Sequence, residues 1–121
     1  MLGINWEKGR ISAAKAFAEE YGCTLLLKGH RSLAAYSDGE VAIATHGNAG
    51  MAKGGSGDVL TGILLGLLAQ GYSREEACKL GVYIHGLAGD IAAEEKTEMG
   101  MTASDIIEAL PSAWKKMSST R

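Results

Sequence analysis

Apolar residues recur three or four positions apart in the first part of the chain, with charged residues between them. The repeat lies within residues 5–21 and is carried by Ile11, Ala14, Phe17 and Ala18. This spacing places the apolar side chains on one face and predicts an amphipathic helix. Asn5 is a suitable N-cap for this helix, and Gly22 is a suitable end.

The next apolar segments have the lengths of strands. Residues 23–28 form an apolar run without alternation that ends in Lys28-Gly29. Such a run is typical of a strand covered on both faces in a parallel sheet. Residues 33–36 and 41–45 flank a polar segment that contains an Asp-Gly pair, which predicts a β-hairpin.

The second half of the chain is predicted to be mostly helical. A glycine-rich loop covers residues 45–58, and a helix from residue 59 to about 70 follows, ending at Gly71. Because this helix is apolar almost all round, it is predicted to be buried. Residues 73–76 match a capping box, Ser-x-x-Glu, which opens a helix that runs towards Glu95.

Two further features concern how the last helices pack and end. Thr102 with Asp105 is predicted to open the final helix, and Pro111 is expected to kink or interrupt it before Trp114. Small residues on the preceding helix permit close packing against a neighbour: Gly81, Gly86, Ala88 and Gly89.

The order of elements is helix, strand, hairpin, glycine loop and three helices. There is no internal repeat and no domain boundary, so residues 1–121 are expected to form one domain. A strand of the parallel, buried type needs neighbours on both sides, and this sequence offers too few of them. Either partner chains supply these strands, or the sequence is the C-terminal portion of something longer.

Composition narrows the function classes. Glycine accounts for 17 of 121 residues, about twice the usual share of ~7%, as expected where backbone lies close to a ligand. The net charge is −2 and the basic residues form no stripe, which argues against a nucleic-acid partner. Cys23 and Cys78 lack the spacing of a metal or redox motif, so core or half-buried thiols in a reducing compartment are expected. Without a signal peptide or a membrane-length apolar run, the protein is expected to be cytoplasmic, with no membrane partner.

Residues 54–58, Gly-Gly-Ser-Gly-Asp, lie at the start of the predicted apolar helix. The first N–H groups of a helix have no partner within the helix, and the helix dipole adds partial positive charge there. Glycines let an anion approach this backbone, which predicts a phosphate or oxyanion site. Asp58, in the first turn, would accept a proton from an attacking hydroxyl group. A carboxylate beside a phosphate suggests Mg²⁺ held largely through water, with no direct protein ligand to the metal predicted.

This short motif also fits an ordinary glycine-rich helix entry with an acidic capping residue. It is not a Walker A loop, because no Gly-Lys-Ser/Thr follows the glycines. It is not a dinucleotide fingerprint either, because the preceding strand is too far away. The physics of the loop alone therefore predicts an anion site without fixing its purpose.

The longer segment 48–62, Asn-Ala-Gly-Met-Ala-Lys-Gly-Gly-Ser-Gly-Asp-Val-Leu-Thr-Gly, carries a closer resemblance. It is similar to the signature of the ADP- or ATP-dependent NAD(P)H-hydrate dehydratases, which belong to the ribokinase-like superfamily. Supporting matches are residues 27–29, 85–90 and 102–105, and the resemblance runs from about residue 11 to residue 114.

The resemblance implies a fold and a reaction. The fold is α/β, a ribokinase-like three-layer α/β/α domain, represented here by its C-terminal portion with few strands and about four helices. The reaction restores NADH or NADPH from its hydrate: a nucleotide phosphorylates the hydroxyl group, phosphate leaves and the nicotinamide double bond returns. Bacterial members generally use ADP and eukaryotic members ATP, and the family often assembles into homo-oligomers.

The resemblance also assigns residues to the site. Gly57, together with Gly55 and Ser56, would lie at the nucleotide phosphates, and Asp58 would contact the hydrate and act as the base. Asn48 opens the matched segment, and a substrate-pocket role is favoured for it over a turn role. The segment that contacts the nucleotide in the family matches Lys28, Gly29, His30, Arg31 and Ser32.

The sequence departs from the family in composition and in length. His30 and Arg31 stand where small residues are frequent, and the family domain is roughly twice as long as this chain. The remaining half would supply most of the strands and much of the hydrate pocket. Two alternatives therefore stay open: a small-molecule kinase of the same superfamily acting on a sugar, pyrimidine or thiazole alcohol, and a non-catalytic nucleotide-binding module.

Several residues outside the motif are assigned supporting roles. His85 and Asp90 do not share a helix face cleanly, so a structural role or a position beside the nucleotide base is favoured over catalysis. His46 is predicted to be a solvated loop histidine. Met51 and Met101 are predicted to be packing residues.

Overall fold

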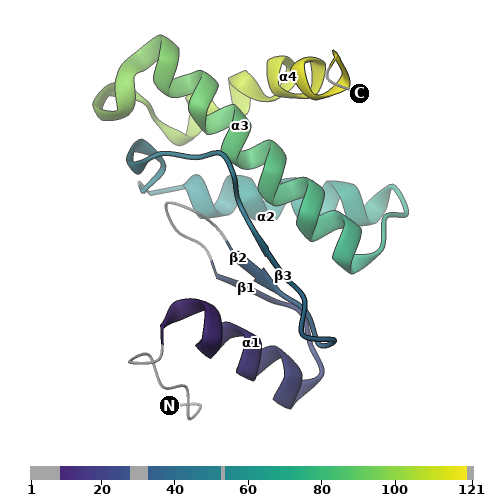
Figure 1. Ribbon diagram of the computed structural model, residues 1–121. Helices are drawn as coiled ribbons and strands as arrows, with labels where there is room; N and C mark the ends of the chain where they lie inside the picture. Colours follow the sequence, from purple (N-terminus) through teal and green to yellow (C-terminus); the bar gives the residue numbers. More distant parts are fainter. Residues whose placement is uncertain (1–8, 28–32, 53, 120–121) are drawn as a thin grey trace.

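The computed structural model describes residues 9–27, 33–52 and 54–119. These residues contain four α-helices, three strands and a short 3-10 helix, η2 (Figure 1). The predicted content of few strands and about four helices is confirmed. The proposed N-cap Asn5, which lies outside the described residues, is wrong for the first helix, because that helix begins at Arg10 with Gly9 as its N-cap. In chain order the elements are α1 (Arg10–Tyr21), β1 (Leu25–Leu27), β2 (Leu33–Ala35), β3 (Val41–Ile43), η2 (Ala49–Met51), α2 (Ser56–Ala69), α3 (Arg74–Gly100) and α4 (Ala103–Ser119).

The three strands form an antiparallel sheet in the order β1-β2-β3. The Asp-Gly turn joins β2 to β3, and Gly39 takes the left-handed φ of 94° that such a turn requires. The Gly39 N–H donates to the Tyr36 carbonyl at 3.0 Å, and the Tyr36 N–H donates to the Glu40 carbonyl at 2.9 Å. The predicted hairpin is therefore confirmed.

The middle strand, β2, is covered on both faces by helices (Figure 1). On one face Leu33 and Ala35 pack in a core cluster with Ala14 of α1. On the other side the Tyr36 hydroxyl donates to the Glu75 carbonyl of α3 at 3.4 Å. The sheet thus lies between a helical layer on each side.

The strand β1 differs from its prediction. Its three residues are each only half-buried, and it pairs antiparallel with β2. Among the described residues it has no second bonded neighbour, so it is an edge strand of this sheet. The prediction of a parallel strand covered on both faces is wrong for the described sheet, because continuous apolarity does not specify how many neighbours a strand has.

The three long helices after the sheet build a second core. The helix α3 packs against both α2 and α4, with Ile84 and Leu87 of α3 and Ile106 of α4 in its centre. Met51 and Met101 are buried in the same cluster, which confirms that they are packing residues.

Several helix ends lie where the sequence predicts them. Gly22 ends α1 in the left-handed conformation, with φ of 59°. At the start of α3 the Ser73 hydroxyl accepts from the Glu76 N–H at 3.2 Å, and the Glu76 carboxylate accepts from the Ser73 N–H at 3.1 Å. These bonds hold the pKa of Glu76 below its usual range. At α4 the Asp105 carboxylate accepts from the Thr102 N–H at 2.8 Å.

The helix α2 begins earlier than predicted and is less buried than predicted. It starts at Ser56, and in it only Ser56, Leu60 and Leu67 are buried. Leu65 is 62% exposed and Leu68 is 42% exposed. The prediction of a buried helix is wrong for the described structure, because α3 and α4 pack against α2 and leave Leu65 and Leu68 exposed.

The last two helices differ in how they follow their predicted limits. The span of α3 reaches Gly100, but it consists of two helices joined at a kink at Thr97, which has a non-helical φ of 65°, so the first of them ends close to the predicted Glu95. The helix α4 continues through Pro111 to Ser119, so the predicted interruption does not occur. Proline removes the donor to the Ile107 carbonyl, and since both residues are exposed, water can satisfy that carbonyl.

The structure bears on the predictions about membrane-spanning segments and about the two cysteines. None of the helices in the described ranges is long and apolar enough to span a membrane. Cys23 and Cys78 are free and half-buried, as predicted. Burial, with a smaller contribution from Glu75, raises the pKa of the Cys78 thiol, which keeps it protonated and weakly reactive at neutral pH.

The close packing predicted for the small residues of α3 gives a stability test. A Cβ placed on Gly86 would clash with the His46 carbonyl oxygen. Because that oxygen belongs to the backbone, we expect Gly86→Ala to lower the free energy of unfolding by about 1–3 kcal/mol, which calorimetry would record as a lower Tm. The matched control is Gly66→Ala, where a Cβ meets nothing within 4 Å and a gain of about 0.5–1 kcal/mol is expected. Equal Tm changes in the two variants would contradict the packing described here.

Candidate functional site

The N-terminus of α2 has no side-chain cap, and its backbone is partly exposed at Gly55 and Gly57. Gly55 is its N-cap and takes the left-handed conformation, with φ of 93° and ψ of −19°. The first N–H of the helix with an acceptor in the described chain is that of Val59, which donates to the Gly55 carbonyl at 3.0 Å. The described residues offer no acceptor to the N–H groups of Ser56, Gly57 and Asp58. This end of the helix is therefore suited to an anion.

Asp58 lies in the first turn of α2, as predicted, and is exposed. Within the described part of the chain, no hydrogen bond or ion pair engages its carboxylate, so the side chain is available to a ligand. A cavity of about 540 Å³ adjoins it between α2 and α4. Residues lining this cavity include Gly55, Asp58, Ala103, Ser104, Ile107 and Trp114.

His85 of α3 fixes the first residue of α2. Its Nε2 lies 3.0 Å from the Ser56 carbonyl oxygen and 3.3 Å from the Ser56 hydroxyl. A carbonyl oxygen only accepts, so Nε2 carries the hydrogen. Burial lowers the pKa of His85, and the bond to the Ser56 backbone opposes that shift. The neutral tautomer with hydrogen on Nε2 therefore ties the start of α2 to α3.

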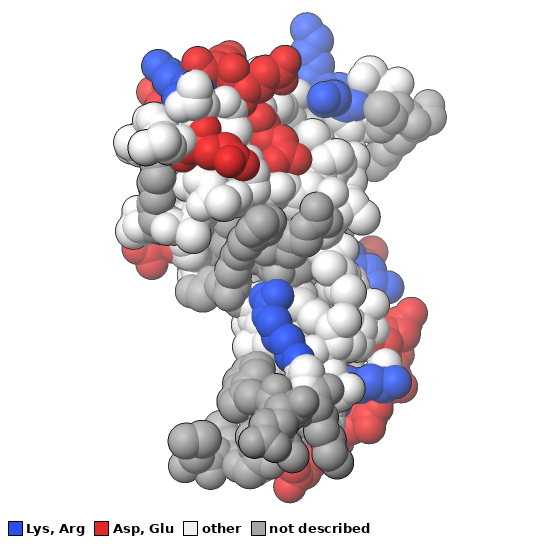
Figure 2. All heavy atoms as spheres, turned by 60° about the vertical axis from the view of Figure 1, so that its left-hand side comes forward, with Lys and Arg blue, Asp and Glu red and all other residues white. Residues whose placement is uncertain are grey.

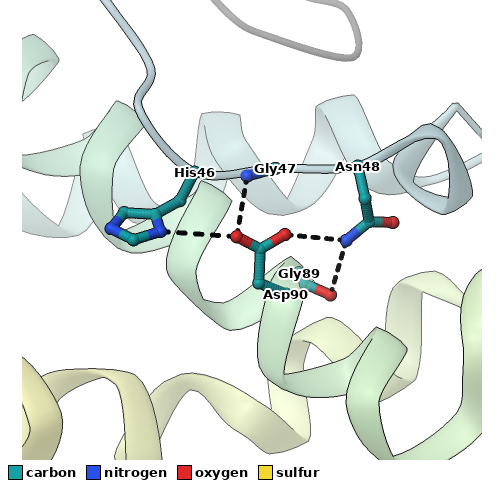
Figure 3. Close-up of polar contacts among 5 residues, drawn as sticks. All are labelled: His46, Gly47, Asn48, Gly89 and Asp90. Atoms are coloured by element: carbon teal, nitrogen blue, oxygen red, sulfur yellow. Dashed lines mark hydrogen bonds and ion pairs between the residues drawn. The ribbon is translucent and has the colours of Figure 1, made fainter.

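Asp90, one turn further along α3, holds the beginning of the glycine loop (residues 46–55) (Figure 3). Its Oδ2 accepts from the Gly47 N–H at 3.1 Å and lies 3.4 Å from the His46 Nδ1. Its Oδ1 accepts from the Asn48 Nδ2 at 2.9 Å. One carboxylate thus contacts three successive residues of the loop.

Asn48 is buried and fully engaged as a donor. Its Nδ2 also donates to the Gly89 carbonyl at 3.1 Å, and its Oδ1 accepts from the Gly50 N–H at 3.0 Å, capping η2. An amide has two hydrogens to donate, and both are used here. In this geometry Asn48 holds the loop in shape. A direct hydrogen bond to a substrate would have to be accepted by its Oδ1, which has one further lone pair.

The structure brings together only part of the predicted site. Gly55, Gly57 and Asp58 meet at the start of α2, while the Ser56 hydroxyl turns inward to His85. The predicted nucleotide-contact residues Lys28, Gly29, His30, Arg31 and Ser32 lie outside the described residues.

The supporting residues are partly as predicted. The structural roles of His85 and Asp90 are confirmed by their hydrogen bonds to the loop. His46 is not simply solvated, because it pairs with Asp90 and packs edge-on against Tyr83 at 5.2 Å.

The sequence did not predict the hydrogen-bond partners of His85 and Asp90. The available signal was the pair of glycines, Gly86 and Gly89, between them. A Cβ on Gly86 would clash with the His46 carbonyl, and one on Gly89 would clash with the Met51 side chain. Glycines one turn apart on a buried helix face indicate close backbone approach by another segment.

Charge is distributed unevenly over the surface. Figure 2 shows acidic side chains gathered at the end of the molecule where the last turns of α3 lie in Figure 1. Exposed acidic residues of that part of α3 include Glu94, Glu95 and Glu98. Among the described residues, no three His, Cys, Asp or Glu side chains are grouped so as to hold a metal ion. An anionic ligand is therefore better placed at the N-terminus of α2 than at this acidic end.

Comparison with known proteins identifies the family. The family model described as NAD(P)H-hydrate dehydratase matches residues 1–112. The bifunctional NAD(P)H-hydrate repair enzyme of Moorella thermoacetica is 47% identical over 105 residues, which cover 87% of this chain and 20% of that protein. The ADP-dependent (S)-NAD(P)H-hydrate dehydratase of Neisseria meningitidis is 42% identical over 101 residues, which cover 83% of this chain and 34% of that protein.

Solved structures agree with this result and identify the fold. The Bacillus subtilis ADP/ATP-dependent NAD(P)H-hydrate dehydratase, co-crystallised with ATP/Mg²⁺ and soaked with CoA, superposes with a TM-score of 0.85 at 32% identity, covering 92% of this chain and 41% of that one. A ribokinase-like superfamily protein from Enterococcus faecalis superposes with a TM-score of 0.77 at 34% identity, covering 95% and 39%. The predicted ribokinase-like fold class is therefore confirmed.

The chain is short beside all of these relatives. It spans between about a fifth and two fifths of their length. The matched part nevertheless includes the glycine loop, Asp58 and the α3 residues that hold them. On this evidence the chain belongs to the NAD(P)H-hydrate dehydratase family.

Proposed function

We propose that this chain supplies the nucleotide-phosphate site and the catalytic base for ADP- or ATP-dependent dehydration of NADH hydrate or NADPH hydrate. The observation that carries the proposal is the uncapped N-terminus of α2 with the exposed Asp58 carboxylate in its first turn. Relatives named as dehydratases match most of the length of this chain, and one of them was crystallised with ATP and Mg²⁺.

Each residue at the start of α2 has a defined part in the proposed reaction. The N–H groups of Ser56 and Gly57 bind the terminal phosphate, with the left-handed Gly55 allowing the close approach. Asp58 accepts the hydroxyl proton of the hydrate while the hydroxyl oxygen attacks the terminal phosphorus, and the bond from that phosphorus to the departing nucleotide breaks. The bond between the ring carbon and the phosphorylated oxygen then breaks and releases phosphate. An adjacent ring carbon loses a proton, and the double bond of the nicotinamide ring returns.

Other parts of the chain support this arrangement. We assign Lys28, Gly29, His30, Arg31 and Ser32 to the nucleotide, as the sequence predicts. The carboxyl end of a strand is where α/β proteins place their ligands, and these residues follow β1. Asn48 was predicted to bind the substrate, and its hydrogen bonds favour a supporting contribution through the loop.

The described residues fit Mg²⁺ only as an ion carried by the nucleotide. No cluster of three carboxylate, histidine or cysteine side chains is present among them, whereas Mg²⁺ commonly keeps several waters and binds substrate phosphates with one or two carboxylates. Asp58 is the carboxylate at this position. When bound, Mg²⁺ would offset the negative charge of the phosphates beside Asp58.

The proposal concerns the portion of the enzyme that this chain carries. The relatives are roughly two to four times as long as this chain by their covered shares, and we assign much of the hydrate pocket to the part of the family domain outside this sequence. A kinase acting on another alcohol would use the same anion site and the same base, and a non-catalytic module would keep only nucleotide binding. A cytoplasmic location and assembly into a homo-oligomer stay predictions.

The central test replaces Asp58 with asparagine. We expect Asp58→Asn to lower turnover of NADH hydrate, followed as recovery of the reduced-nicotinamide absorbance with ADP or ATP and Mg²⁺, by about 10²–10⁴-fold, because the base is lost. Nucleotide affinity, measured by calorimetry, should fall little or rise, because a negative charge beside the phosphates is removed. Glu95→Gln is the matched control, since it removes one exposed carboxylate from α3 without touching the site.

The same assay separates the alternatives. Phosphate transfer to an alcohol without any recovery of the reduced nicotinamide would favour the kinase. Nucleotide binding without either reaction would favour the non-catalytic module. Absence of nucleotide binding by the wild-type chain would refute the proposed site.

A second prediction concerns the backbone at Gly55. Its φ of 93° is strained for any other residue, and a Cβ there would lie 3.0 Å from the Ala103 Cβ. We expect Gly55→Ala to weaken ADP binding about tenfold in calorimetry, because a strain of about 1–2 kcal/mol displaces the N–H groups that bind phosphate. Gly54→Ala meets nothing within 4 Å and should leave the Tm unchanged. Equal ADP affinity in Gly55→Ala and wild type would show that the phosphate lies elsewhere.

A further inference from the structure

The helix α3 holds both ends of the segment that forms the candidate site. His85 bonds to Ser56, the first residue of α2, and Asp90 bonds to Gly47 and Asn48 at the start of the glycine loop. We call the four residues of α3 that face the loop the α3 clamp: His85, Gly86, Gly89 and Asp90. Because they lie within less than two turns of one helix, the two ends of the loop are fixed relative to a single rigid element.

The glycines of the clamp bring the loop onto the helix surface. The space where a Gly86 side chain would lie is taken by the His46 carbonyl, and the space at Gly89 is taken by the Met51 side chain. At this distance the polar side chains on either side, His85 and Asp90, reach the loop directly. The clamp therefore combines close approach with hydrogen bonds at both ends.

The hydrogen bonds of the clamp join α3 to the glycine loop and to the first residue of α2. The Asp90 side chain is 37% exposed, and the partners of its carboxylate within the described part of the chain are loop groups, as Figure 3 shows. Through Asn48 it also acts on η2, because the Asn48 Oδ1 accepts from the Gly50 N–H. His85 is buried, where an apolar residue would pack as well without the cost of placing a polar ring in the core.

We propose that His85 and Asp90 are positioning residues for the phosphate site: His85 sets the start of α2, and Asp90 sets the loop that leads to it. Neither residue contacts Asp58 in the described structure, so both act through the loop and the first turn of α2. The expected effect of these residues on nucleotide binding rests on the proposed function of residues 55–58. Their expected effect on the order of the loop is independent of that function.

The variants separate positioning from simple packing. His85→Leu keeps an apolar body but removes the donor to Ser56, whereas His85→Gln keeps a side-chain N–H that can reach the same carbonyl. Asp90→Ala removes both acceptors. Glu94→Ala is the matched control, since Glu94 is exposed on the next turn of the same helix.

The first readout is amide hydrogen exchange of the ligand-free chain. In Asp90→Ala the amides of Gly47 and Gly50 should exchange at least tenfold faster, because their acceptors are removed or released. In His85→Leu the amide of Val59, which bonds to the Gly55 carbonyl, should exchange at least tenfold faster. The amide of Leu67, far along α2, should change less than twofold in both variants.

The second readout is ADP affinity by calorimetry in the presence of Mg²⁺. His85→Leu and Asp90→Ala should each weaken binding about tenfold, and His85→Gln should restore it to within about threefold of wild type. Loop exchange and ADP affinity unchanged from those of Glu94→Ala would overturn the proposal. So would a uniform loss of protection that includes Leu67, because that pattern indicates a role in global stability only.

The two readouts keep this proposal distinct from the proposed function. If the wild-type chain binds no ADP, the proposed function fails, while the exchange of Gly47, Gly50 and Val59 still decides whether the α3 clamp orders the loop. If ADP binds but the variants behave as Glu94→Ala does, the clamp fails and the phosphate site stands.

Discussion

The hydrogen bonds between α3 and the glycine loop are the constraint on which the candidate site depends. A loop of this composition has little conformational preference of its own, since glycine loses more backbone freedom on ordering than any other residue. His85 and Asp90 offset that cost by bonding to the loop at its two ends. The buried Asn48 extends the hold to η2 through the Gly50 N–H. The N–H groups at the start of α2 are thereby held in place before any ligand arrives, which is what an efficient anion site requires.

The same constraint explains why glycines and polar residues lie close together on α3. At Gly86 and Gly89 the helix needs the absence of a side chain, because the His46 carbonyl and Met51 occupy that space. At His85 and Asp90 it needs polar side chains of defined length. The helix α2 is less well packed than α3, because Leu65 is largely exposed. The relatives extend well beyond the part of the fold that this chain carries. The site is thus well organised on its α3 side within a fold of which this chain carries a portion.

Local signals in the sequence predicted local structure well. The Asp-Gly turn, the Ser73–Glu76 capping box and the end of α1 at Gly22 each depend on residues close together in the chain. The position of Asp58 in the first turn of α2 follows from the same kind of signal. Burial of α2 and the pairing of β1 could not be predicted, because both depend on which distant elements lie alongside. The partners of Asp90 were missed for the same reason: a helix pattern does not show which loop crosses it.

Whether the N–H groups at the start of α2 receive a phosphate is observed most directly by NMR of the isotope-labelled chain titrated with ADP and Mg²⁺. The account predicts that the largest amide shift changes occur at Gly55, Ser56, Gly57 and Asp58, with the amides of α1 nearly unchanged. Changes that are absent from these four residues, or that are largest in α1 or the hairpin, would contradict it.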